Sequence, residues 1–335
     1  MLKLGIIGVG RIGKLHTENI CYNVPEAEVV AIADIFMNSE IKAWAKNFGI
    51  KACYDDYKKI MNDSDIDGVL ICSSTNTHAP ISLEAIAAGK HVFCEKPVDL
   101  SIDKINEVIE ALKDTELKYQ VGFNRRFDHN FKAIRNAVEN GDIGDPHIMR
   151  ITSRDPALPP IEYVKVSGGL FLDMTIHDFD MARFLVGSDV KEIHVFADAL
   201  VDPSIEKVGD VDTAVISMKM ENGTIAMIEN SRKAIYGYDQ RVEILGSKGM
   251  VTISNDLPST AVISNENGVI KEKPLHFFLE RYRESFKNEM KEFVNAVIKN
   301  KAVSVGVYDG LKSVLIGLAA KKSVEESRSV KLSEI

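Results

Sequence analysis

The sequence predicts an α/β protein with two domains. An N-terminal Rossmann domain, a doubly wound parallel sheet, should precede a C-terminal α+β domain with a large open, mainly antiparallel sheet. Apolar runs alternate with helix-compatible stretches from Met1 to about Gly122, which is typical of a parallel sheet with helices on both faces. Beyond about residue 145, strand-like segments follow one another across turn pairs such as Asn222-Gly223, which is typical of antiparallel pairing. We therefore expect a Rossmann domain over residues 1–121 and an α+β domain over residues 122–335.

The individual elements follow from the length and periodicity of the apolar runs, since runs of four to six residues are too short for helices. In the first domain we expect strands at 3–7, 28–33, 68–72, 91–94 and 118–122, and helices near 12–22, 38–48, 56–62, 79–88 and 101–113. In the second domain we expect strands at 147–153, 192–200, 213–220, 224–230, 241–245, 250–254 and 261–264, and helices at 279–299 and 308–327. An open sheet needs a cover for its second face, and a partner subunit is the usual one.

Composition excludes several classes of protein. The chain has 335 residues, 45% hydrophobic and 27% charged, with a formal net charge of −8. An acidic chain without a basic stripe argues against nucleic-acid binding. No apolar run approaches the roughly 18–20 residues that cross a bilayer, and the first strand begins too early for a signal peptide. The four cysteines are widely spaced without a C-x-x-C pair, so we expect a reducing cytoplasm and no metal site.

A dinucleotide site is predicted near the N-terminus. Gly8, Gly10 and Gly13 complete a G-x-G-x-x-G, with Arg11 and Ile12 between them, directly after an apolar strand. The glycines permit a tight turn, close approach of the backbone to a pyrophosphate and close packing of helix on strand. The next strand ends in Asp34, which is placed to accept hydrogen bonds from ribose hydroxyls.

Asp34 also bears on the choice of cofactor. A carboxylate at this place repels a 2′-phosphate, and Ile35 and Phe36 supply no compensating cation. Arg11 is the one nearby positive charge, so the sequence favours NAD and leaves some use of NADP open.

Two polar segments follow later strands of the same sheet, where ligands bind in doubly wound folds. We expect the first to line the cofactor crevice with Ser73, Ser74, Thr75, Asn76 and His78. His78 is alternatively a residue that only starts the next helix. The second is Glu95-Lys96-Pro97. Lys96 can bind a substrate hydroxyl, or take part in proton transfer if desolvation lowers its pKa; the alternative is a surface lysine before a turn.

The segment from Gly168 to Phe184 contains the strongest indication of catalysis. Asp173 and His177 are four residues apart, which on one helix stacks them on the same face. A carboxylate beside an imidazole can fix the orientation of the ring and stabilise its protonated form, as a general base requires. An incidental Asp–His pair on a helix surface is the alternative. Polar side chains that suit a polyol lie elsewhere in this domain, and we expect substrate contacts from Arg126, Arg154, Asp155 and Tyr236.

Three features together resemble the Gfo/Idh/MocA family of oxidoreductases. They are the Gly8–Gly13 loop, Glu95-Lys96-Pro97, and Gly168-Gly169 with Asp173 and His177-Asp178. Finer motifs are similar to the bacterial members that oxidise inositol, namely 72–78, 122–128, 151–156, 171–183 and 236–241.

The resemblance implies oxidation of myo-inositol to 2-keto-myo-inositol with NAD. It also implies a catalytic group of Lys96, Asp173 and His177, cofactor contacts that include Glu95 and Lys96, and a homotetramer built on the open sheets. A related NAD(P)-dependent sugar or scyllo-inositol dehydrogenase is the alternative within enzymes. A non-catalytic dinucleotide sensor on the same scaffold, and a metal-dependent hydrolase or aldolase using Asp173, His177 and Asp180, are the alternatives from other classes.

Overall fold

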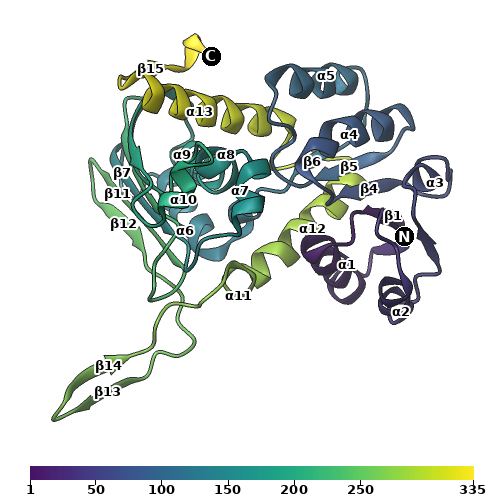
Figure 1. The fold of residues 1–335 in the computed structure, drawn as a ribbon, viewed down its shortest axis with the longest axis horizontal. Coiled ribbons are helices and arrows are strands. Elements are labelled where there is room, and N and C mark those ends of the chain that lie inside the picture. Colours follow the sequence, from purple (N-terminus) through teal and green to yellow (C-terminus); the bar gives the residue numbers. More distant parts are fainter. The chain divides into compact units, whose positions relative to one another are not determined.

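The computed structural model describes all 335 residues, and the chain packs into two compact units (Figure 1). Unit 1 consists of Met1–Phe127 and Glu284–Val314, and unit 2 of Asp128–Arg283 and Leu315–Ile335. Each unit is therefore assembled from two stretches of chain, and unit 1 takes in a C-terminal stretch that a boundary after residue 121 does not foresee.

Unit 1 contains a six-stranded sheet with the order β3-β2-β1-β4-β5-β6, in which every pair of neighbours is parallel. The predicted doubly wound parallel sheet is confirmed. Sequence reasoning missed only β3, a three-residue edge strand. The strands are β1 Leu2–Ile7, β2 Ala27–Ala33, β3 Ala52–Tyr54, β4 Gly68–Ile71, β5 His91–Cys94 and β6 Tyr119–Val121. The strand order reverses between β1 and β4, which is where such sheets bind ligands.

The helices of unit 1 cover this sheet. They are α1 Arg11–Asn23, α2 Ser39–Lys46, α3 Lys58–Met61, α4 His78–Ala87, α5 Ile102–Leu112 and α12 Arg283–Ile298. Met290 and Phe293 of α12 belong to the same buried core as Leu4, Ile6 and Phe93 of the strands. The burial of these apolar side chains fixes α12 against the sheet, although nearly 200 residues of sequence separate it from β5.

Unit 2 contains a seven-stranded sheet with the order β12-β11-β7-β10-β9-β8-β15. Only β7 and β10 pair in parallel; the other neighbours are antiparallel. The predicted mainly antiparallel sheet is confirmed. Its strands are β7 Pro146–Arg154, β8 Val190–Asp198, β9 Thr213–Met220, β10 Ile225–Ser231, β11 Asp239–Gly246, β12 Met250–Ile253 and β15 Val330–Lys331.

One face of the unit 2 sheet is buried and the other is open. Side chains along β9 alternate between buried and exposed, and large apolar side chains remain exposed on the outer face, including Ile148, Phe196, Val215 and Ile225. The helices of the unit are α6 His129–Glu139, α7 Ile161–Ser167, α8 Gly169–Asp173, α9 Ile176–Val186, α10 Pro203–Glu206 and α11 Phe278–Arg281, while α13 Val307–Glu326 begins in unit 1 and ends in unit 2. β13 Val262–Asn265 and β14 Gly268–Lys271 form a separate, fully exposed hairpin that projects from the rest of the unit (Figure 1).

The predicted helix over 279–299 is wrong in one respect, because it is interrupted at Tyr282 between α11 and α12. The physical reason lies at Arg281. Its buried guanidinium bonds Asp128 at 2.6 Å and Asp256 at 3.2 Å. Asp128 also caps α6 by accepting from the backbone N–H groups of Asn130 and Phe131. Helices α6 and α7 were not foreseen from the sequence.

Candidate functional site

The glycine-rich loop has the geometry of a phosphate cradle. Gly8 has φ of 90°, and a Cβ on it would lie 2.6 Å from the backbone nitrogen of Ser73. A Cβ on Gly13 would collide with the carbonyl oxygen of Gly8, whereas a Cβ on Gly10 would meet nothing within 4 Å. Gly8 and Gly13 are thus required by packing, and Gly10 borders open space. Because α1 begins at Arg11 without a side-chain cap, its first N–H groups are available to an anion.

Asp34 is fixed directly beside this loop. Its two carboxylate oxygens accept hydrogen bonds from the backbone N–H of Val9 at 2.7 Å and of Phe36 at 2.8 Å. Each oxygen keeps a lone pair for a ribose hydroxyl. Ile35 and Phe36 are 79% and 75% exposed, so the surface that these two residues form beside Asp34 is apolar. These positions fit the adenosine half of NAD.

The polar loop after β4 is held together from within. The hydroxyls of Ser73 and Thr77 are 2.6 Å apart, and residues Thr75–Thr77 form a short 3-10 turn. His78 is 2% exposed, and its ring nitrogens bond the carbonyl oxygens of Pro97 at 2.7 Å and Ser73 at 3.0 Å. Burial alone lowers the pKa of His78, but Cys94 and these two carbonyls outweigh it and raise the pKa to about 9. The ring joins two loops of the site, which favours the structural alternative over direct cofactor contact.

Lys96 lies at the carboxyl end of β5. It is partly exposed, and its peptide bond to the buried Pro97 is cis. The preceding Glu95, which we expected near the cofactor, has its carboxylate 2.8 Å from Nε2 of His16 on α1. Glu95 and Lys96 are both partly exposed, and the Glu95 carboxylate joins the end of β5 to α1.

Arg126 is enclosed within unit 1, where its side chain is 8% exposed. It donates to the carbonyl oxygen of Ser304 at 3.1 Å and to the carboxylate of Asp309 at 2.9 Å. These bonds tie the segment after β6 to the first turn of α13. They are a structural use of the guanidinium, and substrate binding by Arg126 stays a prediction.

In unit 2, Asp173 and His177 lie on two consecutive short helices, so the expected single helix is wrong. Asp173 is the last residue of α8, and His177 is the second residue of α9. The carbonyl oxygen of Leu170 accepts from both Met174 and Thr175, which closes α8. The hydroxyl of Thr175 then donates to Asn230 of β10 at 2.7 Å. Asp173 and His177 remain the partly exposed positions within a stretch, 170–182, that is otherwise buried.

The position of α8 depends on the two glycines before it. Gly168 and Gly169 have φ of 92° and 80°, a conformation that L side chains adopt rarely. The backbone N–H of Leu170 donates to both carboxylate oxygens of Asp210, at 3.0 and 3.1 Å. A Cβ on Gly169 would lie 2.5 Å from Asp210. The Gly-Gly pair thus lets Asp210 cap the helix that carries Asp173.

Two partners of Asp173 were missed by sequence reasoning. The hydroxyl of Tyr163 donates to Oδ1 at 2.8 Å, and the guanidinium of Arg232 lies 3.4 Å from Oδ2. Arg232 is 1% exposed. The one signal in the sequence for Arg232 was its position directly after β10. No local sequence pattern connects residue 232 to residue 173. The two donors fix the carboxylate in one orientation.

Arg154 and Tyr236, both expected to contact substrate, are brought together at one end of β7. The guanidinium of Arg154 donates to the Tyr236 hydroxyl at 2.6 Å and pairs with Glu229. Tyr236 donates in turn to Asp239 at 2.6 Å. Asp155 is held through its backbone, which bonds Ser231 and Ala234. This network of polar side chains can hydrogen-bond a polyol.

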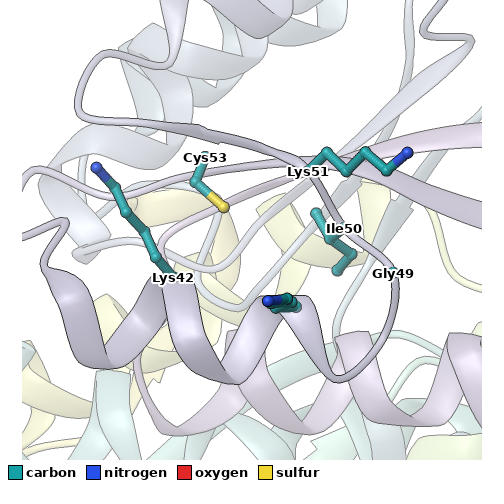
Figure 2. A pocket seen from close by; sticks show the side chains of 6 residues that line it. Lys42, Gly49, Ile50, Lys51 and Cys53 are labelled. Carbon is teal, nitrogen blue, oxygen red and sulfur yellow. The ribbon is translucent and has the colours of Figure 1, made fainter.

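A hollow lies apart from these residues, on the side of unit 1 where α2 precedes the edge strand β3 (Figure 2). It is lined by Lys42, Lys46, Gly49, Ile50, Lys51 and Cys53, none of which the sequence singled out. The structure contains no group of three or more metal-ligand side chains and no helix long and apolar enough to cross a membrane.

Similarity to known proteins identifies the family of this chain. The model of the oxidoreductase family with an NAD-binding Rossmann fold matches residues 2–123, and that of the GFO/IDH/MocA C-terminal domain matches residues 131–252. Myo-inositol 2-dehydrogenase of Thermotoga maritima is 47% identical over 100% of this chain and 99% of its own. Inositol 2-dehydrogenase of Rhizobium meliloti is 41% identical, with 99% of each covered.

A solved structure gives the same result. Scyllo-inositol dehydrogenase from Lactobacillus casei, with bound NAD(H) and scyllo-inositol, matches with a TM-score of 0.92 at 33% identity and covers 99% of both chains. The predicted family and the predicted cofactor, NAD, are confirmed. This chain belongs to the Gfo/Idh/MocA family of NAD-binding oxidoreductases.

Proposed function

We propose that this chain catalyses the NAD-dependent oxidation of myo-inositol to 2-keto-myo-inositol. The observation that carries the proposal is the fixed Asp173, held by Tyr163 and Arg232 and followed by the partly exposed His177, in a chain that also holds a complete dinucleotide cradle. The names of the relatives agree with a polyol substrate. A catalytically silent sensor would not need a carboxylate oriented by two donors.

NAD would accept the hydride that leaves the carbinol carbon. The residues of the chain bind and orient the cofactor and the substrate. Backbone N–H groups at the start of α1 would hold the pyrophosphate, Gly10 would leave the space for it, and Asp34 would accept from the ribose hydroxyls. Ile35 and Phe36 would offer apolar surface to the adenine.

The proton of the reacting hydroxyl must leave as the carbinol is oxidised, so a base must come within hydrogen-bond distance of that oxygen. We assign this role to His177, with Asp173 binding a neighbouring hydroxyl or orienting the imidazole. Lys96 binds the reacting oxygen. The alternative is that Lys96 is the immediate base and His177 passes the proton on. The further hydroxyls of the ring are assigned to Arg154, Asp155 and Tyr236.

A second copy of the chain is the proposed cover for the outer face of the unit 2 sheet, where Phe196 is 72% exposed and Ile225 59% exposed. Apolar patches of this kind mark protein interfaces. We propose a homotetramer. All four cysteines are free, which supports a reducing cytoplasm as the compartment.

The test is the initial rate of NADH formation with myo-inositol, scyllo-inositol and glucose, each offered with NAD and with NADP. We expect the highest kcat/KM for myo-inositol with NAD. A preference for scyllo-inositol, for which the L. casei similarity gives a reason, would reassign the substrate within the same reaction. Reduction of NAD by none of the three would reject the proposal.

A further inference from the structure

Of three titratable side chains in unit 1, only Glu95 has an expected role in the proposed chemistry, as a cofactor contact. His16 and Glu289 are both 0% exposed, and Glu95 is only partly exposed. They come from three elements: α1, the end of β5, and α12. His16 bonds Glu95 at 2.8 Å, and the charge of Glu95 contributes to raising the pKa of Glu289. Two carboxyl groups and one imidazole thus share one buried region.

The His16 side of the His16–Glu95 pair is enclosed by the core, while the Glu95 side chain is 15% exposed. The ring of His16 lies edge-on to Phe93 at 5.1 Å and to Phe286 at 5.8 Å. A Cβ on Gly122 would lie 2.8 Å from an oxygen of Glu95, so this glycine makes room for the carboxylate. The His16 ring cannot move without displacing these core side chains. The bond therefore ties α1, which starts at the phosphate cradle, to the residue before Lys96.

Glu289 is in a different situation from Glu95. Neither of its carboxyl oxygens has a hydrogen-bond partner, and its own turn of α12 contributes the apolar Phe286, Met290 and Phe293. Gln120 of β6 donates to the backbone oxygen of Glu289, at 3.2 Å, and not to its carboxyl. An ionised carboxylate here would be buried without a counter-charge, which is far more costly than a buried neutral acid.

The other titratable groups around Glu289 strengthen this conclusion. Burial raises the pKa of Glu289 well above its ordinary value, and the charge of Glu95 raises it further. Burial likewise raises the pKa of Cys72, at the end of β4, with Glu95, Cys94 and Glu289 adding to the effect. No lysine or arginine contributes to either shift.

We propose that Glu289 is a protonated acid in the folded enzyme, and that it acts as a positioning residue by leaving Glu95 as the one negative charge paired with His16 at the end of β5. Ionisation of Glu289 would put a second negative charge beside Glu95 and disturb the turn that carries Lys96. The consequence for catalysis rests on the proposed function of Lys96, whereas the protonation of Glu289 does not.

The sign of the pH effect follows from the direction of the shift. A group whose folded pKa is raised contributes stability that is present below the ordinary carboxyl value of 4.5 and is lost as the pH rises toward the folded pKa. In that window the folded state holds a proton that the unfolded chain has released. The unfolding equilibrium constant then rises by up to about tenfold per pH unit, about 1.4 kcal/mol.

The experiment compares E289Q, which has the shape of the neutral acid, with wild type and with E284Q. Glu284 lies on the same helix, but its side chain is 66% exposed and pairs with Lys287, so it is the matched control. Urea unfolding is measured from mildly acidic to alkaline pH. In the window where Glu289 holds its proton, we expect the unfolding equilibrium constant of wild type to rise by up to about tenfold more per pH unit than that of E289Q, and E284Q to follow wild type. Parallel curves for all three proteins would overturn the proposal.

A second measurement does not depend on how well the variant folds. The infrared spectrum of folded wild type at neutral pH should contain a band from a buried protonated carboxylic acid, which E289Q lacks and E284Q retains. Absence of the band in wild type would overturn the proposal. In active enzyme, the fall of kcat at alkaline pH should be shallower in E289Q with KM for NAD unchanged. Failure to oxidise any polyol would reject the proposed function and leave the unfolding and infrared results to decide the protonation of Glu289.

Discussion

Asp34 in unit 1 and Asp173 in unit 2 are both fixed carboxylates, but different parts of the chain fix them. Asp34 is held by backbone N–H groups of its own loop and of the glycine loop. Asp173 is held by side chains ten and fifty-nine residues away, Tyr163 and Arg232. The first arrangement uses only backbone donors, so it does not depend on which side chains the donating residues carry. The second depends on individual side chains delivered by the tertiary fold.

The largest loss of activity is expected at the two residues assigned to the reacting hydroxyl, Lys96 and His177. Lys96→Met should lower kcat toward the upper end of the roughly 10²–10⁴-fold range of acid–base catalysis. The substitution removes the positive charge that binds the reacting oxygen and, in the alternative mechanism, the base itself. Binding of NADH, followed by fluorescence, should persist because the cradle is built from backbone. Lys42→Met, in the hollow of Figure 2, is the control with unchanged turnover. Normal kcat in a folded Lys96→Met enzyme would return Lys96 to the role of a surface lysine.

His177→Ala should lower kcat by about 10²–10³-fold, within the usual contribution of a general base. The affinity for NAD should stay near that of wild type, since no part of the cradle changes. The activity of wild type should fall as the pH drops through the apparent pKa of the coupled group, and this limb should disappear from the pH–rate profile of the variant. An unchanged profile with near-normal kcat would remove His177 from the mechanism.

A side chain that orients Asp173 should matter less than one that touches the reacting atoms. Arg232→Met removes a charged hydrogen-bond donor worth about 1.5–3 kcal/mol, so kcat/KM for the polyol should fall about 10–100-fold. Arg183→Met breaks the ion pair with Asp189, 2.7 Å long and closer to solvent, and should leave kcat/KM nearly unchanged. Equal effects of the two substitutions would mean that Arg232 supports folding alone.

The smallest effect is expected at Asp34. Its side chain sets the preference for NAD over NADP, whereas backbone N–H groups at the start of α1 would bind the pyrophosphate. NAD should be preferred over NADP by at least about tenfold in kcat/KM, about 1.4 kcal/mol. Asp34→Ser combined with Ile35→Arg should narrow or invert this ratio while leaving the polyol specificity unchanged. Equal use of the two cofactors by wild type would defeat the argument from Asp34.

The sequence predicted unit 1 well because its signals are local. Glycine spacing, short apolar strands and an acid at a strand end depend only on neighbours in the chain. It missed the break between Asp173 and His177 because residues 170–186 contain neither glycine nor proline. The break depends instead on Thr175 bonding Asn230, which also donates to Asp178 at 3.0 Å. It missed the break at Tyr282 for the same kind of reason, since Arg281 meets Asp128 across 153 residues of sequence.

The candidate site divides in the same way. The cradle glycines and Asp34 could be assigned by motif, and the structure gives each one a geometric role. Tyr163, Arg232 and Glu289 could not be assigned, because their importance comes from what the fold places beside them. The predicted roles of Lys96, Asp173 and His177 rest on family resemblance and on the local geometry of each unit, and they stay predictions until variants are measured.

The most direct test of the central claim is transfer of deuterium from myo-inositol labelled at carbon 2. Wild-type enzyme should form one deuterated NADH for each 2-keto-myo-inositol, with a slower chemical step than for unlabelled substrate. Folded His177→Ala should still bind NADH but transfer the label at a small fraction of the rate. Formation of unlabelled NADH, or no reduction of NAD by a folded enzyme that binds NADH, would contradict it.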